Sequence, residues 1–288
     1  MEDNQAGSTH GVYALCFANN KGGVGKTTSA AAIAYLFATE GQKKVLLIDA
    51  DAQTNLSTQM KARMDGRCDV QSAVMSKVAN ANILVSNFVV PTQYENIAII
   101  PGNRAIEGKT FTTQVDTMRT ETGINPWQEV IDSVKELHLY DTIIVDTHPS
   151  TGTDTLLPAQ ACDYIISPMG PDDHSVSGFL QMYFKIIQSR RNASTPKILG
   201  CFFNRIKKNT SNSKQYVPSA KKLIPQKALE LTGKPLEGII FNTEIRDSED
   251  ARKAINFQCA VTERYNKKNI GIDFKKLYKE IVEAIENG

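Results

Sequence analysis

The sequence has few of the features that mark secreted, membrane-spanning or metal-binding proteins. No stretch of its 288 residues approaches the ~20 consecutive apolar residues of a membrane-spanning helix, and the opening residues MEDNQAGSTHG lack the apolar segment of a signal peptide. The five cysteines, at positions 16, 68, 162, 201 and 259, form no CxxC pair and have no histidine at metal-binding spacing. These absences predict a soluble, cytoplasmic protein with reduced thiols and a disordered tail over residues 1–11.

The charge of the chain is nearly balanced but unevenly distributed. The formal net charge of +2 excludes a uniformly basic surface. Residues 205–288 nevertheless carry 17 Lys and Arg against 11 Asp and Glu, a net charge of +6, whereas residues 1–204 carry a net charge of −4. A surface that binds a polyanion is therefore to be sought in the last third of the chain.

Short apolar runs alternate with helical segments, which is the pattern of βα units that build a parallel sheet. Several runs are apolar at consecutive positions, as is typical of strands buried on both faces. The predicted fold is therefore α/β, with a mostly parallel, twisted sheet, helices on both faces and a single domain over residues 12–288. Strands are expected at 12–18, 44–49, 96–101, 141–147, 163–169, 197–204 and 238–242.

The clearest helix signals are a glycine stop after an alanine-rich segment and a proline at a first helical turn. Helices are expected at 27–40, 126–137, 174–190 and 214–231, with a weaker helix at 70–78 and an edge strand within 83–90. The final helix has one apolar stripe, formed by Phe274, Leu277, Tyr278, Ile281, Val282 and Ile285. Because its tip is acidic, we expect this helix to pack on the sheet and not to lie on a membrane.

The segment ANNKGGVGKTTSAAA, residues 18–32, predicts a phosphate-binding loop between a strand and a helix. Its glycines let backbone N–H groups approach an anion, and the helix N-terminus lies behind them. Lys26 is expected to reach the β- and γ-phosphates, and the Thr27 hydroxyl is expected to coordinate Mg²⁺. The predicted nucleotide-binding residues of this loop are Gly22, Gly23, Val24, Gly25, Lys26, Thr27 and Thr28.

The same loop departs from the usual pattern at two positions. Asn20 stands where the first glycine of the motif is expected, and a second lysine, Lys21, follows it. A loop that holds one triphosphate needs only one lysine at its end, so the role of Lys21 has to be found outside the standard motif.

Acidic residues end two of the predicted strands. Asp146 ends the apolar strand DTIIVDT, where folds of this kind place a ligand for Mg²⁺, usually through water. Asp49 and Asp51 in LLIDADAQTN are two positions apart, and they lie on the same side if the strand continues. One carboxylate could orient the attacking water and the other could support the metal, but the residues alone do not rank the two.

Together, KGGVGKTT, IDADAQTN and DTIIVDTHPS resemble the motifs of the ParA/MinD family of P-loop ATPases with a deviant Walker A loop. The resemblance is closest to ParA-type partition ATPases and extends over most of the chain from about residue 12. FFNRIKK is similar to the adenine-side strand end of that family, and EIRDSEDARKAINFQCAV is similar to its late loop and helix.

The resemblance implies a role for each matching position. Lys21 resembles the signature lysine, which crosses the interface of an ATP-bound sandwich dimer to reach the phosphates of the other subunit. Asp51 resembles the residue that orients the attacking water, and Asp49 the one that supports the magnesium shell. Asn204 is similar to the adenine-recognising asparagine. The implied catalytic set is Lys21, Lys26 and Asp51, and the implied metal set is Thr27, Asp49 and Asp146.

Two positions differ from the family pattern. Ala52 stands where the family usually has proline, which we expect to alter only the stiffness of a turn. His148 stands where the family motif has its first proline. This places an ionisable group near the γ-phosphate, and we expect a solvent-facing side chain there and not a catalytic one.

Three alternatives remain for what the dimer binds besides ATP: DNA, a membrane or an iron-sulfur cluster. A ParA-like dimer binds DNA without sequence preference through basic residues. A MinD-like positioning ATPase uses a basic amphipathic helix to reach a membrane. Reductase relatives hold an iron-sulfur cluster on exposed cysteines, which we discard because Cys162 and Cys201 lie beside or inside apolar runs. Candidate DNA-binding residues are Lys207, Lys208, Lys214, Lys221, Lys222, Arg252, Lys253, Arg264, Lys267 and Lys268.

The sequence is therefore identified with an ATP- and Mg²⁺-dependent partition ATPase, of plasmids, chromosomes or another cargo. The resemblance implies slow ATP hydrolysis, an ATP-dependent homodimer, nonspecific DNA binding in the nucleoid and no membrane binding. Few residues precede the first strand, so we expect no helix-turn-helix domain there. A ParB-like centromere-binding partner would then supply sequence specificity and stimulate hydrolysis.

Overall fold

The computed structural model describes residues 11–63, 66–188, 196–207, 210–233 and 240–287. Within them, a seven-stranded sheet has the order β3-β4-β2-β5-β1-β6-β7. Neighbouring strands are parallel except β3, which pairs antiparallel with β4 at one edge. The strands are β1 (Tyr13–Phe17), β2 (Val45–Ala50), β3 (Val90–Pro91), β4 (Ile97–Ile100), β5 (Thr142–Thr147), β6 (Tyr164–Met169) and β7 (Lys197–Phe203).

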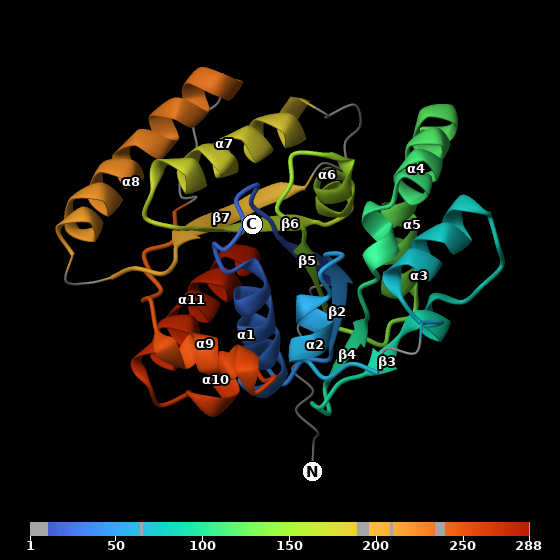
Figure 1. Ribbon diagram of the computed structural model, residues 1–288, viewed down its shortest axis with the longest axis horizontal. Coiled ribbons are helices and arrows are strands. Elements are labelled where there is room, and N and C mark those ends of the chain that lie inside the picture. Colours follow the sequence, from blue (N-terminus) through green and yellow to red (C-terminus); the bar gives the residue numbers. More distant parts are fainter. Residues whose placement is uncertain (1–10, 64–65, 189–195, 208–209, 234–239, 288) are drawn as a thin grey trace, which may run out of the picture.

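Helices cover both faces of this sheet, which confirms the predicted α/β architecture (Figure 1). One face is covered by α1 (Lys26–Thr39), α2 (Asn55–Gln59), α9 (Glu249–Asn256), α10 (Val261–Arg264) and α11 (Asn269–Glu286). The other face is covered by α3 (Val70–Val78), α4 (Lys109–Thr122), α5 (Pro126–Glu136), α6 (Thr153–Gln160), α7 (Asp173–Gln188) and α8 (Ser211–Thr232).

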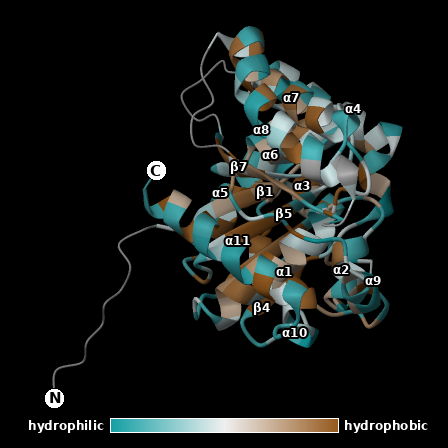
Figure 2. Cartoon of the chain, turned by 90° about the vertical axis from the view of Figure 1, so that its left-hand side faces the viewer, coloured by the Kyte–Doolittle hydropathy of each residue, from teal (hydrophilic) through white to brown (hydrophobic). Residues whose placement is uncertain are grey.

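The two helix layers explain why the strands are apolar at consecutive positions. In β1, Leu15 and Phe17 pack into the core under α1 and α11, whereas Ala14 and Cys16 pack into the core on the opposite face. Successive side chains of a strand point to opposite faces, so a strand covered on both sides needs apolar residues throughout. Figure 2 shows these hydrophobic strands between the two layers.

Six of the seven expected strands are confirmed, as are the expected helices, including α3 at the weak signal near residue 70. The expected strand at 238–242 lies partly outside the described residues, and there Ile240 forms only an isolated bridge with Cys201. The edge strand expected within 83–90 is mostly wrong, because that segment forms the 3-10 helix η1 (Val85–Phe88) and contains only Val90 of the two-residue strand β3. The tail predicted for residues 1–11 falls almost entirely outside the described residues.

Several helices had no clear sequence signal. In α4 only Phe111 and Val115 are buried, so no continuous apolar stripe predicts it. The helix α6 contains Pro158, and α2 is only five residues long. Such segments become helical because tertiary packing stabilises them, and local propensity alone does not predict them.

The apolar stripe of α11 is buried in the core, as predicted. Phe274, Leu277, Ile281 and Ile285 are among the core residues beneath this helix. In the part of the chain that the structure describes, no helix combines the length and the apolar character needed to cross a bilayer. The thiols of Cys16, Cys162 and Cys201 are buried, as their apolar surroundings predict.

Candidate active site

The site lies where the central parallel strands end at their carboxyl edge. In the strand register, Asp146 of β5 is opposite Phe17, the last residue of β1, and on its other side it is opposite Asp49 of β2. The loop formed by residues 18–25 leads from β1 directly into α1. The acidic residues and the glycine-rich loop are therefore neighbours, as is expected at the carboxyl ends of strands in such sheets.

The loop has the backbone conformation that its glycines were predicted to allow. Gly23 and Gly25 have φ angles of 73° and 93°, in the left-handed region that favours glycine. Gly25 also lies so close to Asn204 that a Cβ atom there would overlap its amide. The Asn204 Nδ2 donates a hydrogen bond to the Val24 carbonyl at 2.8 Å. Asn204, far away in sequence, is thus packed on the loop.

Lys26 is buried inside the loop, with only 6% of its surface exposed. Its Nζ donates to the carbonyl oxygens of Asn19, at 3.2 Å, and Lys21, at 3.4 Å. Burial lowers the pKa of Lys26, and the carboxylates of Asp146 and Asp51 act in the opposite direction. The ammonium is therefore held among carbonyl groups at the place where phosphates would lie.

Asp146 is a buried carboxylate that lacks the hydrogen bonds such a group needs. It is fully buried, and neither oxygen has a partner of normal hydrogen-bond geometry among the described residues. Burial, followed by the charge of Asp49, raises the pKa of Asp146 well above its usual value, although Thr27 and Lys26 lower it. An unpaired buried carboxylate is costly, and a hard cation would relieve that cost. Thr27 and Asp146 therefore fit a Mg²⁺ site.

Asp49 is held by α2 and does not point freely toward a metal. Its Oδ2 accepts hydrogen bonds from the Ser57 backbone N at 2.8 Å and the Ser57 Oγ at 2.6 Å. Burial raises the pKa of Asp49 to about 6, although these hydrogen bonds lower it. The strand ends at Ala50, so the condition under which Asp49 and Asp51 would lie on one side is not met. The predicted role of Asp49 in supporting the magnesium shell stays a prediction.

Asp51 lies in the turn after β2, beside His148. Its Oδ1 accepts a hydrogen bond from the Gln53 backbone N at 2.9 Å and lies 3.2 Å from His148 Nδ1. The same His148 nitrogen lies 2.9 Å from Glu107 Oε1, in the 3-10 helix η2 (Arg104–Glu107). The expectation of a solvent-facing His148 is wrong, because its ring joins two carboxylates and its side chain is only 25% exposed.

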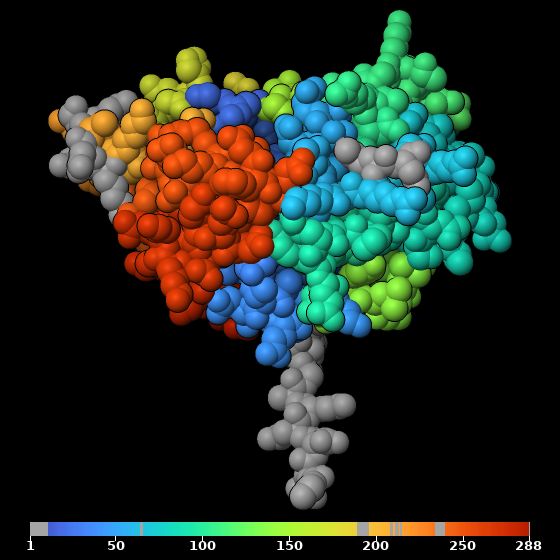
Figure 3. All heavy atoms as spheres, turned by 60° about the horizontal axis from the view of Figure 1, so that its bottom comes forward, coloured from blue at the N-terminus to red at the C-terminus, as the bar shows by residue number. Residues whose placement is uncertain are grey.

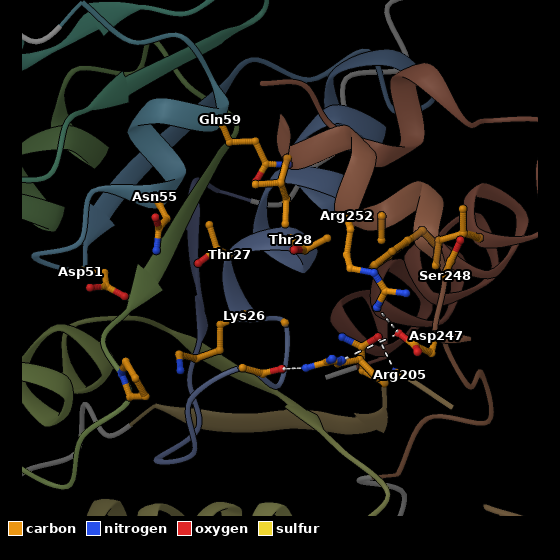
Figure 4. A pocket seen from close by; sticks show the side chains of 18 of the residues that line it. Lys26, Thr27, Thr28, Asp51, Asn55, Gln59, Arg205, Asp247, Ser248 and Arg252 are labelled. Carbon is orange, nitrogen blue, oxygen red and sulfur yellow. Dashed lines mark hydrogen bonds and ion pairs between the residues drawn. The ribbon is translucent and has the colours of Figure 1, made fainter. Parts of the chain in front are cut away.

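A cavity of about 530 Å³ extends from this loop toward α9. This volume lies in the range of small-molecule sites. Figure 4 shows Lys26, Thr27 and Asp51 on one side and Arg205, Asp247 and Arg252 on the other. Arg205 Nη1 donates to the Gly23 carbonyl at 2.8 Å, and Arg252 pairs with Asp247 at 3.2 Å. The cavity therefore runs from the phosphate loop to the late helix.

Comparisons with known proteins agree with this geometry. Residues 12–198 match the sequence model of a family described as AAA domain. The virulence plasmid ParA family protein pGP5-D of Chlamydia psittaci is 26% identical over 275 residues, which cover 93% of each chain. The sporulation initiation inhibitor protein Soj of Bacillus subtilis is 26% identical over 215 residues, covering 74% of this chain and 80% of Soj. The chain belongs to the ParA/MinD superfamily of P-loop ATPases.

Solved structures show the same fold. Apo McdA of Cyanothece has a TM-score of 0.73 at 19% identity, covering 95% of this chain and 99% of McdA. The septum site-determining protein MinD of Pyrococcus horikoshii, solved with Mg-ADP, has a TM-score of 0.68 at 20% identity, covering 94% and 96% of the two chains. These likenesses show the fold, and it agrees with the family to which the chain belongs.

Lys21 of this ATPase lies at the rim of the site and pairs within its own chain. Its Nζ lies 2.6 Å from Asp172 Oδ1, with side-chain exposures of 35% and 37%. Asp172 directly precedes α7 and also accepts a hydrogen bond from the Ser175 backbone N at 2.9 Å. Partial burial raises the pKa of Asp172, but the hydrogen bonds from Lys21 and Ser175 outweigh it, so the pKa is lowered. The predicted contact of Lys21 with a second subunit stays a prediction.

Sequence reasoning missed several residues of the site. Ser57, Glu107 and Asp172 belong to no motif, and each meets its partner through the fold. Arg205 directly follows the predicted Asn204, and this neighbouring position could have indicated that Arg205 lies at the site. Asp172 could have been found as a helix-start residue, because aspartate is a preferred residue immediately before a helix, but not as a partner of Lys21.

The candidate DNA-binding residues that the structure describes come from two parts of the chain, around α8 and from α9 to the start of α11. Lys208 lies outside the described residues, and the side chain of Lys214 in α8 is not described. Lys207 is exposed before α8 and Lys222 is exposed within it, whereas Lys267 and Lys268 are exposed just before α11. Figure 3 shows residues from α9 to α11, in orange and red, gathered on one lobe.

Four of the other candidates already have partners. Lys221 pairs with Glu244 at 2.9 Å, and Lys253 pairs with Glu249 at 3.2 Å. Arg252 pairs with Asp247 and lines the cavity, so it is placed for a nucleotide more than for DNA. The Arg264 guanidinium stacks 3.8 Å over the Phe257 ring. The exposed lysines are therefore the better DNA-binding candidates.

Proposed function

We propose that this ParA/MinD ATPase is a partition ATPase that binds ATP and Mg²⁺ and closes into a sandwich homodimer. The ATP-bound dimer binds DNA without sequence preference. A ParB-like partner stimulates slow hydrolysis of ATP, which releases the dimer from DNA. The cargo moved by this cycle is a plasmid, a chromosome region or another assembly.

The observation that carries this proposal is the different placement of the two loop lysines. Lys26 is 6% exposed and is bonded to carbonyl oxygens inside the loop. The Lys21 side chain is 35% exposed and reaches Asp172 at the rim. One buried lysine is sufficient for the phosphates of the subunit's own nucleotide. A second lysine at the rim is suited to phosphates that approach from outside the subunit.

The acidic residues support a reaction that depends on Mg²⁺. Thr27 and Asp146 are the residues that would hold the ion, and Mg²⁺ there would neutralise negative charge on the nucleotide phosphates. Asp51, at the mouth of the loop, accepts a hydrogen bond from an attacking water and orients it. Lys26 stabilises the negative charge that develops on the phosphates.

The position of α11 supports the partition function over a MinD-like membrane function. A membrane-binding helix needs a free apolar face. Here Phe274, Leu277 and Ile281 are buried, and they form part of the core beneath the sheet. The exposed Lys267 and Lys268 lie at the start of this helix, where they are available to DNA phosphates.

Analytical ultracentrifugation with ATP and Mg²⁺ tests the dimer. We expect Asp51→Ala to bind ATP, lose turnover and accumulate as a dimer. Lys21→Ala should bind ATP but stay monomeric, whereas Lys109→Ala, which removes an exposed lysine of α4, should dimerise like the wild type. If Lys21→Ala dimerises as well as Lys109→Ala, the proposed contact across the interface is wrong.

A mobility-shift assay with unrelated duplex DNA tests the cargo. We expect a shift with ATP and no shift with ADP, and a weaker shift for the double variant Lys267→Ala/Lys268→Ala. The same protein should not sediment with vesicles of anionic lipid. ATP-dependent sedimentation with vesicles and no DNA shift would replace the partition proposal with the MinD-like alternative.

A further inference from the structure

Asp51 is attached to the rest of the site at one carboxylate oxygen. Its Oδ1 accepts the hydrogen bond of Gln53 N at 2.9 Å and faces His148 Nδ1 at 3.2 Å. Among the described residues, no hydrogen bond to Oδ2 is present, so this oxygen is left for a water molecule. The orientation of the carboxylate therefore depends on a backbone turn and on one side chain, His148.

The His148 ring is itself held in place. The backbone carbonyl of His148 accepts a hydrogen bond from Thr155 Oγ1 of α6 at 2.7 Å, which anchors the loop after β5. Its Nδ1 lies 2.9 Å from Glu107 Oε1, so Glu107 and Asp51 face the same ring nitrogen. The three residues come from η2, the turn after β2 and the end of β5, and only the fold joins them.

The arrangement determines which nitrogen carries a proton. A neutral imidazole has one N–H donor and one acceptor nitrogen. An acceptor lone pair on Nδ1 would face two carboxylates and would be repelled by both. Nδ1 must therefore carry hydrogen, and it donates to Asp51 and Glu107. A proline at position 148, usual in the resembled family, has no side-chain donor, so this arrangement is a feature of this chain.

We propose that His148, held by Glu107, is a positioning residue that fixes the Asp51 carboxylate in the orientation needed for ATP hydrolysis. This inference rests on the proposed role of Asp51. A carboxylate that rotates about its side-chain bonds orients a water less often, and misplacement by about 1 Å can reduce a rate strongly. Nucleotide binding depends instead on the phosphate loop, so it should not change.

Substitutions at His148 provide the test, with the catalytic rate and the ATP dissociation constant measured separately. We expect His148→Ala to lower kcat about tenfold with little change in ATP affinity, and His148→Asn, whose amide donates from nearly the same place, to stay within about threefold of wild type. His138→Asn is the matched control, since His138 is exposed at the end of α5. Equal kcat values for His148→Ala and wild type would overturn the proposal.

Glu107 gives a second test that does not disturb the core. Its side chain is 34% exposed, so Glu107→Ala should fold normally and should lower kcat in the same direction as His148→Ala. An unchanged kcat for Glu107→Ala would remove Glu107 from the proposal. Asp51→Ala separates the two proposals. If Asp51→Ala keeps full turnover, the proposed role of Asp51 fails, whereas a loss only in Asp51→Ala means that the positioning by His148 fails.

A transition metal is the competing explanation of the cluster. The ligand atoms of Asp51, Glu107 and His148 lie within 4.8 Å of one another, and one imidazole with two carboxylates can bind Zn²⁺. Calorimetry with Zn²⁺ alone, on nucleotide-free protein, distinguishes the two. We expect no stoichiometric binding. Tight binding that His148→Ala abolishes would overturn the positioning proposal in favour of a metal site.

Discussion

The Ser57 hydroxyl joins two buried groups at the base of the active site, and we expect Ser57→Ala to lower the free energy of unfolding. The Ser57 Oγ donates to Asp49 Oδ2 at 2.6 Å and accepts from the Gly102 N at 2.9 Å. Ser57 and Asp49 are fully buried, so water cannot replace the lost bonds without rearrangement. The alanine leaves the Gly102 N–H without an acceptor and the Asp49 carboxylate with one donor fewer.

The magnitude follows from these two losses. A buried group left without its partner costs about 1–3 kcal/mol, and more when the partner is charged. In the variant, the backbone N of residue 57 still donates to Asp49, at 2.8 Å in the wild type, so the carboxylate keeps one of its hydrogen bonds. We therefore expect a loss of about 2–4 kcal/mol in the free energy of unfolding. Urea unfolding of the nucleotide-free protein at pH 7.5, above the Asp49 pKa of about 6, measures it.

Ser29→Ala is the matched control. Ser29 is also fully buried, but its hydroxyl has no hydrogen-bond partner among the described residues. Removal of an unsatisfied hydroxyl should leave stability unchanged or raise it slightly. If Ser57→Ala and Ser29→Ala change the free energy of unfolding equally, the hydrogen bonds of Ser57 do not stabilise the site and the reasoning is refuted.

Three further predictions concern the charged groups of the site. Lys26→Ala should abolish ATP binding in calorimetry, because it removes the buried ammonium; measurable binding at wild-type affinity would contradict its phosphate role. Asp172→Asn should release Lys21 and strengthen the ATP-dependent dimer about two- to fivefold, since exposed ion pairs contribute about 0.2–1 kcal/mol; a weaker dimer in ultracentrifugation would show that Asp172 itself is needed at the interface. Because burial raises the pKa of Asp49 to about 6 in the folded state, the protonated carboxyl stabilises the nucleotide-free protein fully below about pH 4. This stabilisation is lost as the pH rises through about 6, and the loss amounts to at most about 3 kcal/mol in the free energy of unfolding. Asp49→Asn should lack this pH dependence in urea unfolding.

Much of the fold was predictable because its signals are local. A strand covered by helices on both faces has to be apolar at consecutive positions, and β1, β2, β5 and β6 show this in the sequence. The bounds of α3 were predicted although its signal is weak. The helices α4 and α6 were not, because α4 buries only Phe111 and Val115 and α6 contains Pro158, so their helicity depends on the packing around them.

The sequence by itself determined the phosphate loop, since glycines at 23 and 25 are required by backbone conformation and Lys26 and Thr27 follow them directly. It also placed Asp146 beside the loop, because parallel strands end at the same edge of a sheet. These inferences depend on neighbours in the chain or on strand order, which the apolar pattern encodes.

Only the tertiary structure decided how the carboxylates are used. Asp49 is bonded to Ser57, Asp51 faces His148 and Glu107, and Lys21 reaches Asp172 from 151 positions away. Hydrogen bonds and ion pairs act over about 3 Å, and no pattern along the chain records which distant side chains approach so closely. The sequence therefore shows that Lys21 departs from the usual phosphate-loop pattern, but its position at the rim of the site is a property of the fold.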